Sequence, residues 1–121
     1  MLFRGLLWSF LLLSSLSVRA ALPLTPFERS ATYTLPNSTE VSAYLHQLTQ
    51  QSSQASVLSL GRSAGGRPIN ALLLSHDAAF LKNGQPETHR PTVMLIGSQH
   101  GNEPSGTEAV QILARQLLDG D

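Results

Sequence analysis

The stretch TVMLIGSQHGNEPSG (residues 92–106) decides the fold, because an apolar run changes there into a polar turn. Apolar residues at consecutive positions, as in TVMLIGS (92–98), are typical of a strand covered on both faces within an α/β sheet. Pro104 suits the first turn of a following helix, and Gly120 suits its end. That helix should bury one apolar face, made of Val110, Leu113, Ala114 and Leu117.

The turn after the predicted strand carries two residues that are good zinc ligands, His100 and Glu103. Sites in open α/β sheets form at the carboxyl ends of strands, which is where this turn lies. A catalytic zinc keeps three protein ligands and one open position for water. The spacing H-x-x-E alone is weak evidence, but the strand before it and the helix after it favour a Zn²⁺ site at His100 and Glu103.

The residues before this stretch predict a helix and a hairpin. Asn37 is a good N-cap with Glu40 at the capping-box position, and the helix should bury Val41, Tyr44, Leu45 and Leu48. Two strand-like runs, 57–60 and 69–74, flank GRSAGGRP, whose paired glycines indicate a tight turn. A phosphate-binding loop is disfavoured because a strand follows it. The complete order of helix, hairpin, loop, strand and helix predicts an α/β layered fold.

The other three histidines are interpreted as solvated. His46 lies off the apolar stripe of its helix, while His76 and His89 lie in a polar stretch that reads as a surface loop. The 121-residue chain has no cysteine, one lysine and a net charge near zero. These features exclude disulfides and thiolate metal sites, and they argue against a nucleic-acid partner. They assign no oligomeric state.

The first twenty residues match a secretory signal peptide. A basic residue, Arg4, precedes an apolar run from Leu6 to Leu16, and Val18 and Ala20 fit the small-residue cleavage rule. The run is too short to span a membrane. We expect cleavage after residue 20, a periplasmic or secreted protein with no membrane attachment afterwards, and an extended leader with three prolines at 21–36.

Three segments together resemble the zinc carboxypeptidases of the carboxypeptidase A/B group, in a bacterial exported form. They are the helix STEVSAYLHQL (38–48), the hairpin LGRSAGGRPINALLLS (60–75) and the loop PTVMLIGSQHGNEPSG (91–106). The resemblance implies that residues 37–121 are the N-terminal portion of a mixed-sheet, three-layer α/β zinc-peptidase domain. It also implies that His100 and Glu103 are the first two zinc ligands, that the substrate is a peptide and that the reaction is metal-assisted hydrolysis.

The family's remaining functional residues lie downstream of the zinc loop. They are a third ligand, a His, together with the arginines that bind the substrate carboxylate, a tyrosine and the catalytic glutamate. None precedes Asp121, and Glu108 lies on the helix that leaves the site, so no catalytic residue is assigned. We therefore expect this chain to be an incomplete piece of such an enzyme, inactive by itself.

Two other interpretations stay open at the level of sequence. Zinc amidases of the succinylglutamate desuccinylase and aspartoacylase type use an HGNE-like loop as well, although the signal pattern and the GRSAGGRPI hairpin argue against them. An exported binding or structural module that keeps the ligand loop without catalysis is the third hypothesis.

Overall fold

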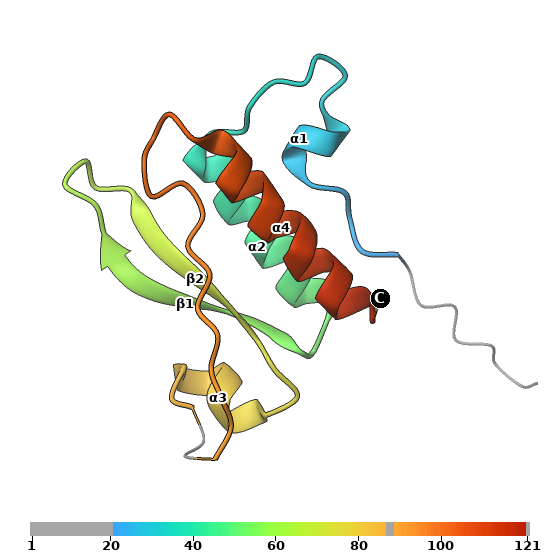
Figure 1. Ribbon diagram of the computed structural model, residues 1–121, viewed down its shortest axis with the longest axis vertical. Helices are drawn as coiled ribbons and strands as arrows, with labels where there is room; N and C mark the ends of the chain where they lie inside the picture. The colour runs from blue at the N-terminus through green and yellow to red at the C-terminus, as the bar shows by residue number, and fades with distance from the viewer. Residues whose placement is uncertain (1–20, 87–88, 121) are drawn as a thin grey trace, which may run out of the picture.

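A computed structural model describes residues 21–86 and 89–120, so the predicted signal peptide at 1–20 lies outside the described residues. The elements are α1 (Pro26–Arg29), α2 (Ser38–Gln51), β1 (Ala55–Arg62), β2 (Pro68–Leu74), α3 (Ala78–Asn83) and α4 (Pro104–Asp119). Figure 1 shows α2 and α4 running alongside each other next to the β1–β2 hairpin. The expected α/β class is confirmed.

The predicted helix over the second segment forms as α2, with the caps that its sequence indicates. The Asn37 side chain accepts hydrogen bonds from the backbone amides of Thr39 and Glu40, at 2.9 and 3.1 Å. The Glu40 carboxylate accepts one from the Asn37 amide at 2.8 Å, which completes the capping box. Tyr44 and Leu48 are fully buried, and His46 is exposed as expected.

The predicted hairpin also forms, with β1 and β2 antiparallel from the pair Ala55–Leu74 to the pair Arg62–Pro68. Its turn closes where the amide of Gly66 donates to the Ser63 carbonyl at 2.8 Å, with Gly66 at φ 75°. The register shifts between Ser59 and Gly61, which is a β-bulge. One consequence is that the strands twist more strongly near the turn.

A small apolar core joins the ends of the described chain to its middle. It contains Leu22, Tyr44, Leu48, Ala55, Ala114 and Leu118. The prediction for the buried face of α4 was therefore partly wrong, because Gln111, Ala114 and Leu118 are buried while Leu113 and Leu117 are 38% and 55% exposed. Both faces of this helix carry apolar residues, and contact with α2 and with residues 22–28 decides which face is buried.

The predicted strand at 92–98 is the main correction. These residues form no strand, and Val93 and Met94 are each 79% exposed. A strand needs a hydrogen-bonded neighbour, and over residues 21–86 and 89–120 the only sheet is β1–β2. Figure 1 shows the segment passing from α3 to α4 as an irregular chain in front of the hairpin.

Two segments expected to be irregular contain short helices. The leader at 21–36 includes α1, whose capping box joins Thr25 and Glu28. The surface loop at 76–91 includes α3, which begins after the N-cap Asp77 and ends at Gly84 with φ 71°. Throughout the described part of the chain, every helix falls short of the length and apolar character that a membrane span requires.

Candidate metal centre

His100 and Glu103 lie on the loop that leads into α4. The amide of Glu103 donates to the His100 carbonyl at 3.1 Å, so the backbone between them forms a tight turn. Glu103 is the N-cap residue of α4, but its side chain makes no capping hydrogen bond. Its carboxylate is therefore available for another partner, and that partner is the imidazole.

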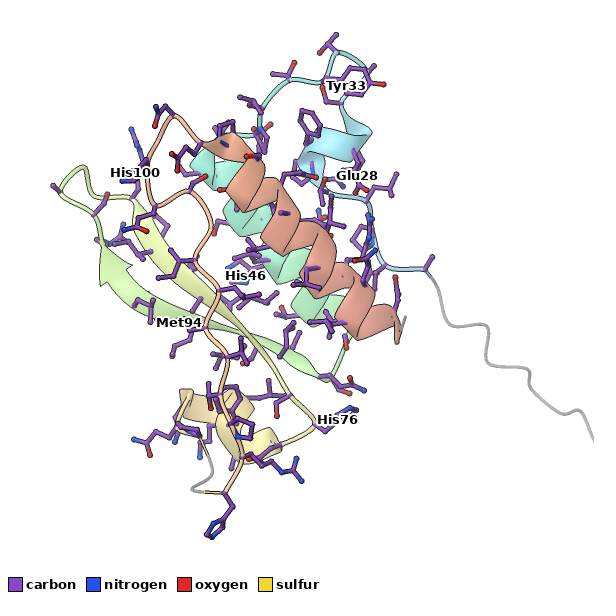
Figure 2. All side chains as sticks on the ribbon, in the orientation of Figure 1. Glu28, Tyr33, His46, His76, Met94 and His100 are labelled. Carbon is purple, nitrogen blue, oxygen red and sulfur yellow. The ribbon has the colours of Figure 1, made fainter. Side chains whose placement is uncertain are left out.

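The two predicted ligands do come together. The distance from His100 Nδ1 to Glu103 Oε2 is 3.2 Å, and the side chains are 68% and 61% exposed. Figure 2 shows His100 on the outside of this loop, away from the α2–α4 core. An imidazole nitrogen and a carboxylate oxygen on adjacent side chains form a donor set that suits Zn²⁺. The residues present therefore fit two of the three protein ligands of a catalytic zinc.

The described residues place no third ligand near this pair. Among residues 21–86 and 89–120, no three His, Asp or Glu side chains gather closely enough to hold a metal ion. His46 lies exposed on α2, and His76 lies exposed between β2 and α3 (Figure 2). These positions agree with the interpretation of both histidines as solvated residues.

The base of the ligand loop is closed by tight backbone packing. A Cβ on Gly97 would lie 2.8 Å from the Gly106 carbonyl oxygen and 2.9 Å from the Thr107 Cα. A Cβ on Gly106 would lie 3.2 Å from the amide nitrogen of Ser98. The backbone at Gly97 thus lies directly against the backbone at Gly106, and residues 98–105 form the loop between them.

Glu108, on the first part of α4, points to a different partner. Its Oε1 accepts a hydrogen bond from the Thr25 hydroxyl, and its Oε2 is buried with no hydrogen-bond partner among the described residues. Thr25 is itself fully buried. Glu108 therefore binds the N-terminal segment rather than the ligand loop.

A second polar contact also ties the N-terminal segment to the helices. The buried Tyr44 hydroxyl donates to the Pro23 carbonyl at 3.1 Å. Burial raises the pKa of Tyr44 to about 12, although the positive charge of Arg115 acts in the opposite direction. This contact was not predicted from the sequence, because the two residues are 21 positions apart.

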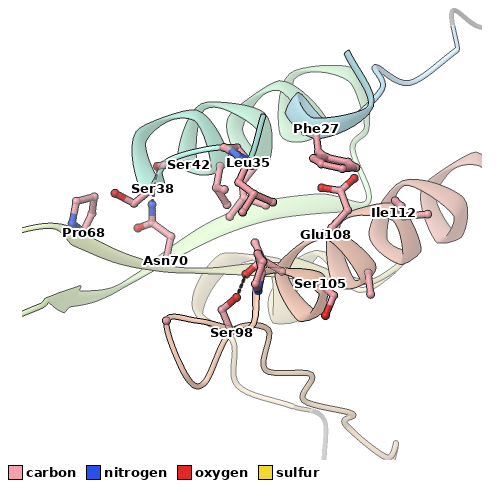
Figure 3. A pocket seen from close by; sticks show the side chains of 17 residues that line it. Phe27, Leu35, Ser38, Ser42, Pro68, Asn70, Ser98, Ser105, Glu108 and Ile112 are labelled. Carbon is pink, nitrogen blue, oxygen red and sulfur yellow. Dashed lines mark hydrogen bonds between the residues drawn. The ribbon is translucent and has the colours of Figure 1, made fainter. Parts of the chain in front are cut away.

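An open cavity of about 890 Å³ lies beside the ligand loop, between α2 and α4 (Figure 3). Phe27, Leu35 and Ile112 contribute apolar walls, while Ser98 and Glu108 contribute polar atoms. His100 and Glu103 do not line it. The candidate metal ligands therefore lie outside this cavity rather than inside it.

A comparison with known protein families identifies the family of this chain. The family model described as zinc carboxypeptidase matches residues 41–121, which include most of α2, the hairpin, the loop and α4. The chain belongs to the zinc carboxypeptidase family. The resemblance inferred from the three sequence segments is therefore confirmed.

One curated relative of this zinc carboxypeptidase chain is carboxypeptidase E of Caenorhabditis elegans. The two sequences are 31% identical over 85 residues, which cover 69% of this chain. The chain spans 17% of the length of that relative. No solved structure shows significant similarity to the chain.

Proposed function

We propose that this chain forms part of a zinc metallocarboxypeptidase that releases single amino acids from the C-terminus of peptides. The observation that carries the proposal is the placement of His100 and Glu103, whose donor atoms lie 3.2 Å apart on the loop before α4. Family membership supports a function of the metallocarboxypeptidase type. We further propose that His100 and Glu103 are zinc ligands of this chain.

In this proposal the two side chains would hold one zinc ion. A bound zinc ion would supply Lewis-acid chemistry, which lowers the pKa of water and polarises carbonyl groups. The high exposure of His100 and Glu103 leaves the loop accessible to a third ligand and to a peptide. Because Glu108 is bonded to Thr25, we do not assign it as the general base of the proposed reaction.

We also propose that the protein works in the periplasm or outside the cell. The support is the pattern at residues 1–20, where Arg4 precedes an apolar run and small residues. A peptide substrate and an exported enzyme are compatible, since peptides with free C-termini occur in those compartments as products of other hydrolases.

The test is peptide cleavage followed by mass spectrometry, with and without a chelator. The chain alone, which offers two ligands, should be inactive. Joined to the remaining length of a family domain, it should release one C-terminal residue at a time, and His100→Ala or Glu103→Ala should abolish this. His76→Ala, on the exposed connection after β2, is the matched control and should stay active.

Two outcomes would reject the proposal. Full activity of the His100→Ala protein would remove the zinc assignment. Cleavage of an N-acyl amino acid, with no cleavage of peptides, would support an amidase of the desuccinylase type instead.

A further inference from the structure

Ser98 has an unusual backbone conformation at the start of the ligand loop. Its φ is 50°, in the left-handed region that residues other than glycine, asparagine and aspartate rarely occupy. Such a conformation costs free energy and persists when surrounding contacts hold it in place. Glycine would adopt it without strain, so the serine side chain is the feature that needs an explanation.

The Ser98 hydroxyl spans the loop. It donates to the carbonyl oxygen of Glu103 at 2.9 Å, and it accepts a hydrogen bond from the Thr107 hydroxyl. Figure 3 shows the second of these bonds as a dashed line at Ser98. The hydroxyl of Thr107, the hydroxyl of Ser98 and the carbonyl of Glu103 thus form a chain of two bonds, which joins the entrance of the loop to the first turn of α4.

These bonds act on the two proposed ligands through the backbone. Fixing the Glu103 carbonyl also fixes the peptide that carries the Glu103 side chain. The turn from the Glu103 amide to the His100 carbonyl then restricts His100. The tight contact between Gly97 and Gly106 holds the base of the same loop. Each of these contacts narrows the range of positions available to the His100 and Glu103 donor atoms.

We infer that Ser98 and Thr107 are positioning residues that pre-organise His100 and Glu103 for metal binding. This inference rests on the proposed function. A ligand loop that is ordered before the metal arrives loses less conformational entropy on binding, so its affinity is higher. Groups that orient metal ligands commonly change metal affinity by roughly 10–100-fold when they are mutated.

The first experiment needs no metal. Hydrogen exchange of the Glu103 amide is measured by NMR in the chelator-treated protein. Thr107→Val, which keeps the shape but loses the hydroxyl, should speed exchange about fivefold. Ser98→Ala, which keeps the Cβ and its backbone strain, should do the same. Thr107→Ser should restore slow exchange, and Thr49→Val on α2 should have no effect at Glu103.

The second experiment measures Zn²⁺ affinity by calorimetry on the same variants. Thr107→Val and Ser98→Ala should each weaken zinc binding by roughly 10–100-fold, with Thr107→Ser close to the unmodified protein. Thr49→Val again serves as the control.

The outcomes separate this inference from the proposed function. Unchanged Glu103 exchange in both variants would overturn the inference, and so would faster exchange spread equally over the β1–β2 amides. Faster exchange at Glu103 alone supports it. If the unmodified protein then binds no zinc, the positioning role stands and the zinc assignment is rejected.

Discussion

Arg115 and Glu28 are 87 positions apart in the sequence, yet Arg115 Nη1 and Nη2 contact Glu28 Oε2 and Oε1 at 2.5 and 2.8 Å. The exposed fractions of the two side chains are 14% and 26%. A bidentate pair of this kind is geometrically specific. It joins α1 to α4 and closes the described part of the chain on itself.

The first prediction concerns acid stability. The hydrogen bond from Arg115 holds the pKa of Glu28 below its ordinary value, despite the opposing effect of burial. A lowered folded pKa adds stability above the unfolded pKa of about 4.3, and that stability is lost as the pH falls through the folded value. Denaturant titrations from pH 7 to pH 3 should show this loss as a fall in the free energy of unfolding. In the Glu28→Gln variant, that fall should be smaller.

Two variants that each remove one positive charge complete this test at pH 7. Arg115→Met should lower the free energy of unfolding by about 1–3 kcal/mol. Arg67→Met, on the exposed hairpin turn, should change it by less than about 0.5 kcal/mol. Equal effects of the two variants would contradict a stabilising role for the Glu28–Arg115 pair.

The second prediction concerns Tyr44. The chain has two tyrosines, so Tyr33→Phe leaves Tyr44 as the only phenol. Its ultraviolet titration should give a pKa of about 12, because burial disfavours the charged form. A raised folded pKa means that the related stability is present below pH 10 and is lost as the pH rises from about 10 towards 12. A midpoint near 10 in the folded protein would be inconsistent with the buried Tyr44.

The third prediction concerns zinc binding by the chain itself. Two ligands without a third should bind Zn²⁺ weakly, and calorimetry should detect that weak binding. His100→Ala or Glu103→Ala should remove it, because a single remaining donor does not form a site. His46→Ala, His76→Ala and His89→Ala should bind as the unmodified chain does. Loss of zinc binding in one of these three controls would show that the zinc site lies elsewhere in the chain.

The fourth prediction concerns the base of the ligand loop. Gly97→Ala introduces a methyl group 2.8 Å from the Gly106 carbonyl, so the backbone must shift. Thermal or denaturant unfolding should show a loss of about 1–3 kcal/mol. Gly101→Ala is the matched control, because its Cβ meets nothing within 4 Å. Gly97→Ala should also weaken zinc binding more than Gly101→Ala does.

The fifth prediction concerns self-association. Within the described part of the chain, no strand pairs with the exposed apolar residues Val93, Met94, Leu95 and Ile96, and such segments invite pairing between copies. Sedimentation velocity should show concentration-dependent oligomers, or marginal solubility. Met94→Lys should shift the distribution towards monomer, whereas Leu60→Lys, at an exposed site on β1, should have a smaller effect. A monomer at all concentrations would contradict the prediction.

Local signals in the sequence predicted the elements that local contacts stabilise. The Asn37–Glu40 capping box, the Gly65–Gly66 turn and the interval from Pro104 to Gly120 each lie within a few residues or one helix. The capping box Thr25–Glu28 carries the same kind of signal, and it could have predicted α1. The proximity of His100 and Glu103 could also be predicted, because residues three positions apart on one turn bring their donor atoms together.

Such local signals do not predict contacts between segments that are distant in the sequence. The buried face of α4 depends on Leu22 and Tyr44, which the helical period does not identify. The apolar run at 92–98 has a strand-like composition, but composition does not supply a neighbouring strand. Serine and threonine are common residue types, and only the folded loop brings the Ser98 and Thr107 hydroxyls together.

The core that joins α2 to α4 imposes an order of events during synthesis. Leu48 leaves the ribosome well before Ala114 and Leu118, yet all three belong to one cluster. At 5–20 residues per second, the interval is roughly 3–14 s. During that time α4 has not yet been synthesised and cannot cover Tyr44 and Leu48. The nascent chain therefore exposes an apolar surface of the kind that chaperones recognise.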